Sequence, residues 1–451
     1  MIDKKWLKSQ AKKVRKVDWI DPALYRKYGV KRGLRNDNGT GVLVGLTTIG
    51  NVHGYVMNEG EKQPIPGELY YRGINVKDLV EADKKEHRFG YEEVAYLLLF
   101  GELPTAKQLS DWKDKIGSYR KLSDGFRDNA IMKHPSRDLM NALARAVLFA
   151  YAFDPEGTPD DISLEKCLEQ SMDMIGSIPT IVAYAYQAKS HYHDGASLMI
   201  RNPDPKKSTA ENLLMLTRED GKYTRLEADT LDLALILHAE HGGGNNSSFT
   251  THVVTSAHSD MYSSVAASVL SLKGSRHGGA NLRVMKQMEE IKANVKDWKK
   301  PSNVVKYLEL IADKKAGDGS GLIYGLGHAV YTISDPRAQM LKTKAEALAK
   351  EKGRMAEMKL FEMIEDFGPG VIKSRHPSAA DVCANVDLYS GFVYDMLGIP
   401  KELYTPLFAV ARCVSWCAHR MEELVNAGPI IRPAYKPIFH PKEYVRISER
   451  R

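Results

Sequence analysis

Cysteine is scarce in this sequence, with only four in 451 residues. None of the four forms a CxxC pair, so zinc-ribbon and thioredoxin-type motifs are excluded. Cys413 and Cys417 stand one helical turn apart in an apolar stretch, which is typical of buried thiols. We therefore expect Cys167, Cys383, Cys413 and Cys417 to be reduced, as in a cytoplasmic protein, and to form no disulfide.

Long apolar runs are also missing, because no window approaches the eighteen or so consecutive apolar residues that a membrane span requires. The opening segment, MIDKKWLKSQAKKVRKVDWID, lacks the apolar core of a secretory signal, and its composition argues against a mitochondrial presequence. No internal repeat or low-complexity segment is visible. Apolar residues make up 43% of the chain and charged residues 27%, as in ordinary globular proteins.

Positive charge is concentrated at one end, because residues 1–35 carry more than the whole net charge of +7. Such an arm is compatible with nucleic-acid binding, but it lacks aromatic stacking repeats and base-reading motifs. The favoured interpretation is a partly helical extension that is solvated or packed against a partner subunit. We expect neither a nucleic acid nor a membrane among the partners.

The remaining pattern predicts a mainly helical protein with one small β-hairpin. Residues 41–75 are rich in glycine and β-branched residues and predict the hairpin. Apolar residues then recur at helical spacing, and the expected helices include 231–241 and 405–426. The polar, turn-rich segment 188–228 is interpreted as a surface loop region. The predicted parts are a basic extension (1–40), a large helical domain (41–277 and 391–451) and a smaller, more polar helical domain (278–390).

Histidines are the first candidates for chemistry. His238 and His241 are three residues apart and share one face of their predicted helix. The pattern is not HExxH, and no nearby Asp, Glu or Cys completes a zinc set, so we expect no metal site. His241, at the end of that helix, fits equally well as a side chain that bonds free carbonyls there.

Two further histidines lie in glycine-containing loops. His277 stands in GSRHGGAN, just before a predicted helix, where a histidine tends to stay neutral. A neutral N–H is a good donor to a developing oxyanion, although an ordinary loop histidine fits the same pattern. His328 stands in YGLGHAV, whose GxG lacks the other elements of a dinucleotide-binding fingerprint.

Charged residues complete the set of candidates. Arg337 follows Asp335-Pro at the start of a predicted helix, where a cation is unfavourable unless an anion offsets it. Asp387, in NVDLYSG, precedes an apolar helix and fits a helix cap. Arg412 shares its helix face with aromatic residues, so we expect a partly buried guanidinium that needs an anionic partner. Arg432 stands in the apolar, proline-stiffened segment GPIIRPAY.

The order and spacing of these motifs resemble the citrate synthase family over about residues 41–440. The shared motifs are GELYYRG, LHAEHGGGN, GSRHGGAN, GLGHAV followed by DPR, NVDLYSG, and ARCVSW with IIRP after it. The resemblance implies an all-α homodimer whose large and small domains close on the substrates. It also implies an enzyme that condenses acetyl-CoA with oxaloacetate and water to give citrate and CoA, without a metal or redox cofactor.

The resemblance further implies a role for each candidate residue. His277 donates to the enol of acetyl-CoA, Asp387 removes the methyl proton, and His328 polarises and protonates the oxaloacetate carbonyl. A carboxylate base with electrostatic stabilisation of the enolate suits the removal of a weakly acidic proton, and forked arginines suit a dicarboxylate. The implied oxaloacetate contacts are His241, Arg337, Arg412 and, from the neighbouring subunit, Arg432.

The CoA contacts are less closely matched. The implied contacts are Gly325, Leu326, Gly327 and Ala329 of the GLGHAV loop. Thr332 stands where many family members have a basic residue, so Lys373 and Arg375 are the candidates for the CoA phosphates. A second departure is Glu240-His241-Gly242, where family members commonly have Asp-His-Glu.

Other functions remain open at this point. A 2-methylcitrate synthase would use propionyl-CoA with the same residues, and one methylene is worth only about 1–3 kcal/mol of discrimination. A citryl-CoA-cleaving enzyme is disfavoured, because nothing in the sequence suggests a nucleotide-grasp or CoA-ligase module. A catalytically silent paralogue is disfavoured by the joint presence of His277, His328 and Asp387.

Overall fold

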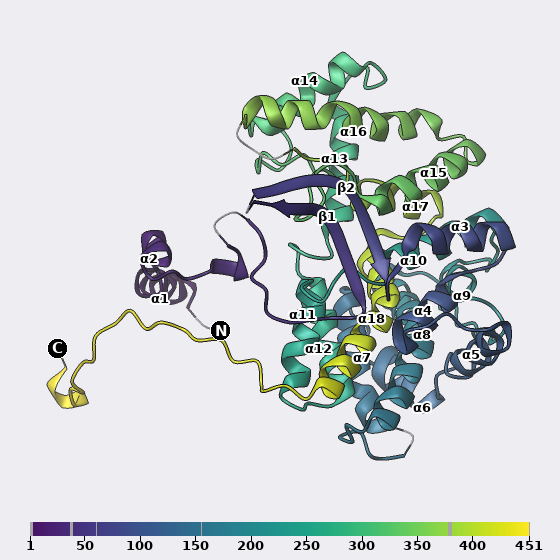
Figure 1. Cartoon of the computed structure of the whole chain (residues 1–451), viewed down its shortest axis with the longest axis horizontal. Coiled ribbons are helices and arrows are strands. Elements are labelled where there is room, and N and C mark those ends of the chain that lie inside the picture. The colour runs from purple at the N-terminus through teal and green to yellow at the C-terminus, as the bar shows by residue number, and fades with distance from the viewer. Residues whose placement is uncertain (1–2, 37–38, 60, 155, 378–380, 451) are drawn as a thin grey trace. The chain divides into compact units, whose positions relative to one another are not determined.

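In the computed structural model (Figure 1), the chain is described over residues 3–36, 39–59, 61–154, 156–377 and 381–450. It forms two compact units, Met1–Leu46 and Thr47–Arg451. The first unit contains α1 (Lys4–Val17), α2 (Pro22–Lys27) and the 3₁₀ turn η1 (Arg32–Leu34). Each of the two helices begins after an aspartate whose carboxylate accepts a backbone N–H of the first turn. The basic extension is therefore helical in part.

A three-stranded antiparallel sheet opens the second unit. Its strands are β1 (Gly50–Asn58), β2 (Glu61–Tyr71) and β3 (Ile74–Asn75), in the order β1-β2-β3. Register runs from Gly50 opposite Tyr71 to Asn58 opposite Glu61, with an irregularity between His53 and Tyr55. The predicted hairpin is confirmed.

Helices make up most of the rest of this unit, and many begin and end at recognisable sequence signals. α4 ends at Gly101, which is left-handed with φ 84°, and Pro104 follows it. Capping boxes open α5, α9 and α10. The first group is α3 (Val76–Glu86), α4 (Tyr91–Phe100), α5 (Ala106–Ser118), α6 (Asp124–Phe126), the π-helical η2 (Arg127–Met132), α7 (Leu139–Ala150), η3 (Tyr151–Phe153), α8 (Leu164–Asp194), α9 (Thr209–Thr217), α10 (Arg225–His238), α11 (Asn246–Ser256) and α12 (Met261–Lys273). The second group is α13 (Ala280–Asn294), α14 (Pro301–Ala312), α15 (Pro336–Glu351), α16 (Met355–Arg375), α17 (Val386–Met396), η4 (Lys401–Leu403), α18 (Tyr404–Asn426) and η5 (Ile447–Glu449).

Helix α18 lies at the centre of the core. Its residues from Tyr404 to Arg420 are buried with one exception, Phe408, which is partly buried. It packs against α4, α8, α10, α11 and α12. Because a helix buried on all faces has no solvent side, its polar residues must find partners inside the protein. Arg412, His419 and Arg420 are buried residues of this helix to which that requirement applies.

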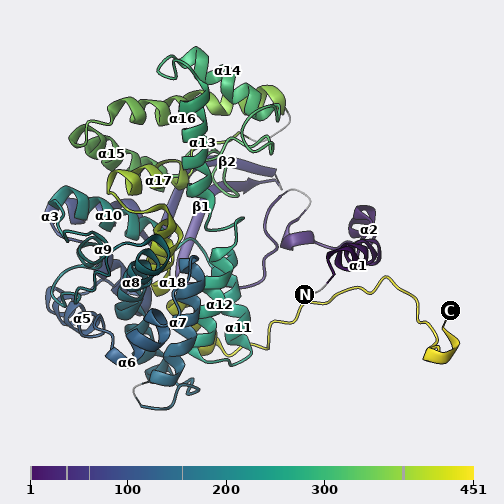
Figure 2. The ribbon, with the colours of Figure 1, turned by 180° about the vertical axis from the view of Figure 1, so that it is seen from behind.

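Helices α13 to α17 gather at one end of the unit, which is visible from both sides (Figures 1 and 2). Within this group α13 and α15 pack on α17, and α14 and α15 pack on α16. α10 contacts both α15 and α17, so the group meets the rest of the unit next to the end of α10. The main fold prediction, a mainly helical protein with a minor hairpin, is confirmed.

Two local predictions are wrong. The segment 188–228 is not a loop region, because α8 continues to Asp194 and α9 lies within it. The polar composition concealed a capping box, in which Ser208 and Glu211 open α9. The helix expected over 231–241 ends at His238, so His241 is in the following loop and does not share a helix face with His238.

After α18 the chain runs on as an exposed C-terminal segment, drawn in yellow in Figure 1. The backbone N–H of Ile431 donates to Oγ of Ser256 at 3.1 Å, which ties the start of the segment to α11. Among the described residues, the helices are all too short or too polar to serve as membrane spans.

Candidate active site

The loop that carries His328 is hydrogen-bonded to the segment that leads into α17, the helix that carries Asp387. Leu326 and Ala384 form an isolated antiparallel bridge. The backbone N–H of Gly327 donates to the Cys383 carbonyl at 2.8 Å, and Nδ2 of Asn385 donates to the Gly327 carbonyl at 2.9 Å. These bonds hold the GLGHAV loop against the residues that begin α17.

His328 has a defined protonation pattern. Its Nδ1 accepts hydrogen bonds from the backbone N–H groups of Val330 and Tyr331, each at 3.1 Å. An accepting Nδ1 carries no proton, so the neutral ring has its proton on Nε2. The ring stacks on Tyr331 at 4.7 Å between centroids, which fixes its plane. His328 therefore presents an N–H donor at Nε2.

Asp387 stands in the first turn of α17 but does not cap it. The cap is Asn385, whose Oδ1 accepts the backbone N–H of Asp387 at 3.0 Å. Burial raises the pKa of Asp387 to about 6, against the opposing charge of Arg337, while the charge of Asp335 raises it further. A carboxylate with a pKa near 6 is ionised at neutral pH and is a better base than an exposed one.

His241 lies in the loop after α10 and faces the His328 loop. Its ring meets that of His328 edge to face, with centroids 5.0 Å apart. Its Nε2 is buried and has no hydrogen-bond partner in the described part of the chain. Burial lowers the pKa of His241 well below its usual value, and Arg337 and His328 lower it further, so the ring is neutral. A neutral ring with a buried, unpaired nitrogen is prepared to contact a polar ligand.

Arg337 is buried at the start of α15 and forms a fork with Asp335. Its Nε and Nη2 donate to the two carboxylate oxygens at 3.0 and 2.7 Å. The anion that the sequence required at this helix start is therefore supplied by the N-cap itself. Only Nη1 of the guanidinium lies outside this fork.

Arg412 is fully buried in α18 and only partly satisfied. Its Nε donates to the His238 carbonyl at 2.7 Å, and its guanidinium lies 4.8 Å from the ring centroid of Phe408. Among the residues described, nothing bonds Nη1 or Nη2. Burial lowers the pKa of Arg412 to about 10, although the charge of Glu240 opposes this. Two parallel, unpaired donors on a buried cation are suited to bind a carboxylate.

His277 also lies near Phe408, with ring centroids 6.4 Å apart. Its Nε2 lies 3.1 Å from Oγ of Ser247, which also accepts the Nε1–H of Trp416 at 3.2 Å. Burial lowers the pKa of His277 to about 4, and Arg412 adds to the effect. The ring is therefore neutral at physiological pH, as expected for an oxyanion donor.

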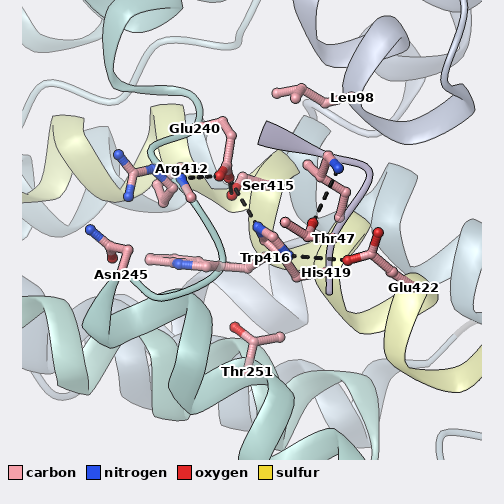
Figure 3. Close-up of polar contacts among 12 residues, drawn as sticks. Thr47, Leu98, Glu240, Asn245, Thr251, Arg412, Ser415, Trp416, His419 and Glu422 are labelled. Carbon is pink, nitrogen blue, oxygen red and sulfur yellow. Dashed lines mark hydrogen bonds and ion pairs between the residues drawn. The ribbon is translucent and has the colours of Figure 1, made fainter. Parts of the chain in front are cut away.

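A buried ion pair that the sequence did not reveal supports this region (Figure 3). Glu240 is fully buried and accepts hydrogen bonds from Ser415 and from Nε2 of His419, the latter at 3.1 Å. Burial alone would raise the pKa of Glu240, but the ion pair with His419 lowers it to about 2. Burial alone would lower the pKa of His419, but Glu240 and Glu422 raise it to about 9. The spacing Arg412, Ser415, His419 on one helix face was the available sequence signal.

Known proteins resemble this chain over most of its length. The family model for the citrate synthase C-terminal domain matches residues 38–434. A citrate synthase of Haloferax volcanii is 35% identical over 370 residues, which cover 81% of this chain and 88% of that protein. This chain belongs to the citrate synthase family. A 2-methylcitrate synthase 1 of Corynebacterium glutamicum is 31% identical over 427 residues, covering 93% of this chain and 98% of that protein.

Solved citrate synthases have the same fold. The enzyme from Pyrobaculum aerophilum matches with a TM-score of 0.75 and 30% identity, covering 91% of this chain and 94% of that one. A ternary complex of the Thermoplasma acidophilum citrate synthase with carboxymethyl coenzyme A and oxaloacetate matches with a TM-score of 0.76 and 28% identity, covering 93% and 99%.

Some residues implied by the citrate synthase resemblance are not part of this cluster. Arg432 is exposed in the C-terminal segment. Lys373 pairs with Asp381 at 3.1 Å, and Arg375 pairs with Glu309 and Asp313. These carboxylates compete with a CoA phosphate, so the CoA roles of Lys373 and Arg375 stay predictions. The loop residues Gly325, Leu326, Gly327 and Ala329 do flank His328.

Proposed function

We propose that this member of the citrate synthase family condenses acetyl-CoA with oxaloacetate and water to give citrate and CoA. The observation that carries the proposal is Arg412, a fully buried guanidinium with two unpaired nitrogens. An uncompensated buried cation is costly, and a carboxylate ligand removes that cost. The neighbouring neutral histidines and the partly buried carboxylate of Asp387 supply the remaining groups that the reaction needs. No redox cofactor is required.

In the proposed reaction, Asp387 removes a proton from the methyl group of acetyl-CoA. The N–H of neutral His277 stabilises the developing enolate oxygen. The enolate carbon then attacks the oxaloacetate carbonyl, to which His328 donates from Nε2, and the carbonyl oxygen takes that proton. Water hydrolyses the resulting citryl thioester and releases CoA as the free thiol, and the proton taken up by Asp387 replaces the one that His328 gave, so that both side chains are restored.

Oxaloacetate is held by its two carboxylates. Arg412 offers the fork of Nη1 and Nη2, Arg337 offers Nη1 beside its pair with Asp335, and His241 offers its buried Nε2. CoA is assigned to the GLGHAV loop, residues 325–329. A CoA-binding role for Lys373 and Arg375 would require them to leave their present carboxylate partners.

A second candidate is 2-methylcitrate synthesis from propionyl-CoA, favoured by the Corynebacterium relative, which spans nearly the whole chain. We expect the purified protein to release thiol from acetyl-CoA only when oxaloacetate is present. Parallel assays with propionyl-CoA give kcat/KM for each thioester, and their ratio decides between the two functions. An absence of thiol release from both thioesters at saturating oxaloacetate would contradict the whole proposal.

We further propose that residues 278–390 act as a small domain that closes on a large domain of 41–277 and 391–451. His328, Arg337 and Asp387 belong to the first, while His241 and Arg412 belong to the second, so a shared ligand bridges them. The mutual packing of α13 to α17 supports grouping these helices, although α17 runs on to Met396, past the boundary proposed at 390. A cytoplasmic location is supported by the four cysteines, which are free thiols.

The protein is proposed to work as a homodimer in which Arg432 reaches the neighbouring active site. Arg432 is exposed and lies in the extended segment after α18. This position supports the proposal, because it leaves the side chain accessible to a second subunit. Arg432→Leu and Asp387→Asn proteins should each be nearly inactive. In a mixed dimer one site keeps both Asp387 and the intact Arg432 of the partner.

An equal mixture with random pairing should therefore recover about a quarter of wild-type activity, with a KM close to wild type. The measurement is thiol release after the subunits have been exchanged, with heterodimer formation checked by native mass spectrometry. If heterodimers form but activity is not recovered, Arg432 does not act across the interface.

A further inference from the structure

A cluster of metal-binding side chains lies beside the loop that follows α10. His252 comes from α11, and His419 and Glu422 come from α18. Nε2 of His252 lies 3.1 Å from Nδ1 of His419, which lies 3.8 Å from Oε2 of Glu422. One ligand atom from each residue falls within 4.8 Å of the others. Tetrahedral zinc places its ligand atoms about 3.3 Å apart, so the two histidine nitrogens are already at the spacing of a metal site.

Each histidine has a carboxylate beside the ring nitrogen that does not face the other histidine. Nε2 of His419 faces Glu240 at 3.1 Å, and Nδ1 of His252 faces Glu423 at 2.8 Å. Figure 3 shows His419 between Glu240 on one side and Glu422 on the other. Carboxylates in this position fix the tautomer of metal-binding histidines and make them more basic.

Because the carboxylates accept N–H groups from Nδ1 of His252 and Nε2 of His419, each ring has one inner nitrogen left, Nε2 of His252 and Nδ1 of His419. The lone pairs of these two inner nitrogens face each other. At 3.1 Å, two such lone pairs repel unless a cation lies between them. The cation is either one shared proton or a metal ion. Three further observations concern the space, charge and access that a metal ion needs.

A Cβ on Gly243 would lie 3.6 Å from Nε2 of His252 and 3.7 Å from Nδ1 of His419, so the glycine leaves the inner nitrogens uncrowded. Oε2 of Glu422 is buried, and the described residues offer it no hydrogen bond, whereas its Oε1 accepts from Thr48. Glu422 also lines an open pocket of about 570 Å³, so one of the three side chains borders a space that solvent reaches.

We propose that His252, His419 and Glu422 bind one divalent transition-metal ion of the zinc class. Two imidazoles and one carboxylate suit zinc and its neighbours better than magnesium or calcium, which prefer oxygen ligands. The ion replaces the shared proton and links α11 to α18. His238 and His241, the pair considered in the sequence, are not its ligands. The site is separate from the residues assigned to catalysis and does not rest on the proposed reaction.

The test uses the full-length protein, stripped with a chelator and then titrated with Zn²⁺ or Co²⁺. We expect one ion per chain by elemental analysis, the visible absorption of four-coordinate Co²⁺, and a higher Tm with Zn²⁺. His252→Gln should weaken binding at least about 100-fold. Glu423→Gln, which keeps all three ligands, should weaken it about 10- to 100-fold.

His258→Asn is the matched control, because His258 is an exposed histidine six residues further along the chain. It also has a left-handed backbone, which asparagine tolerates. This variant should bind zinc as the wild type does. Two results overturn the proposal: wild-type protein that takes up no stoichiometric Zn²⁺, which leaves a shared proton in the site, or uptake that His252→Gln and Glu423→Gln leave unchanged. The wild-type stoichiometry decides even if His252→Gln fails to fold.

Discussion

Replacing Asp387 by asparagine should lower kcat by at least about 100-fold while leaving oxaloacetate binding intact. An amide of the same shape cannot accept the methyl proton, and a base acts only in the transition state, so KM should change little. The measurement is thiol release from acetyl-CoA at saturating oxaloacetate. Asp78→Asn is the control, because Asp78 is an exposed acid in the first turn of α3 and should have no effect on the rate.

The Asp387→Asn variant should be at least as stable as the wild type. Burial raises the pKa of Asp387 to about 6 from an ordinary value near 3.8, so the ionised form is disfavoured in the folded protein. That penalty begins as the pH rises above the unfolded value and is complete above the folded value, which includes neutral pH. Asparagine removes it, so Tm at pH 7.5 should stay the same or rise. A lower Tm with an unchanged kcat would instead indicate a structural role.

The raised pKa also sets a pH dependence. The base must be ionised, so kcat/KM should fall about tenfold per unit below pH 6 in the wild type. The residual activity of Asp387→Asn should lack this acidic limb. If both proteins lose activity together, another group controls the limb.

Replacing Arg412 by methionine should weaken oxaloacetate binding roughly 30- to 5,000-fold, equivalent to about 2–5 kcal/mol. The change removes the two unpaired nitrogens that are proposed to hold a carboxylate. Methionine fills a similar buried volume without charge, so the ligand-free protein should be as stable as the wild type or more so. The measurements are KM for oxaloacetate and Tm with and without oxaloacetate, where the ligand-induced rise should disappear.

Arg420→Met is the matched control for this change. Arg420 is equally buried in α18 and, among the described residues, also has two unpaired nitrogens, Nε and Nη2, but its Nη1 donates to Thr255 and Ser264, which are not assigned to the oxaloacetate site. Its replacement should alter Tm and leave KM for oxaloacetate unchanged. An Arg412→Met protein with a wild-type KM would remove the main support for the proposed oxaloacetate site.

Much of the local structure could be predicted because its signals are contained in short stretches of sequence. The helix expected over 405–426 and the glycine-rich hairpin each depend on neighbours within about ten residues. The same applies to His277, whose loop and following helix are contiguous. Where composition was used in place of these signals, the prediction was wrong, as for 188–228, in which the capping box of α9 went unrecognised.

The roles of buried polar residues could not be predicted in this way. The helix expected to reach residue 241 ends at His238, and Glu240 in the following loop pairs with His419, 179 residues away. Likewise Asp387 is relieved of capping by Asn385, which also fixes the His328 loop. The Glu240–His419 pairing is decided by what the burial of charge requires, and the bond from Asn385 to Gly327 joins residues 58 apart in the sequence.

The sequence by itself determined the family, the helical class and the identity of the residues with chemical potential, because ordered motifs and periodicity are properties of the chain. The tertiary structure alone decided which of them are ready for a ligand. It satisfies Arg337 with Asp335, leaves Nη1 and Nη2 of Arg412 unpaired, and keeps His241 and His277 neutral. The physical reason is that desolvation and pairing depend on neighbours brought together by folding, and a linear sequence does not specify those neighbours.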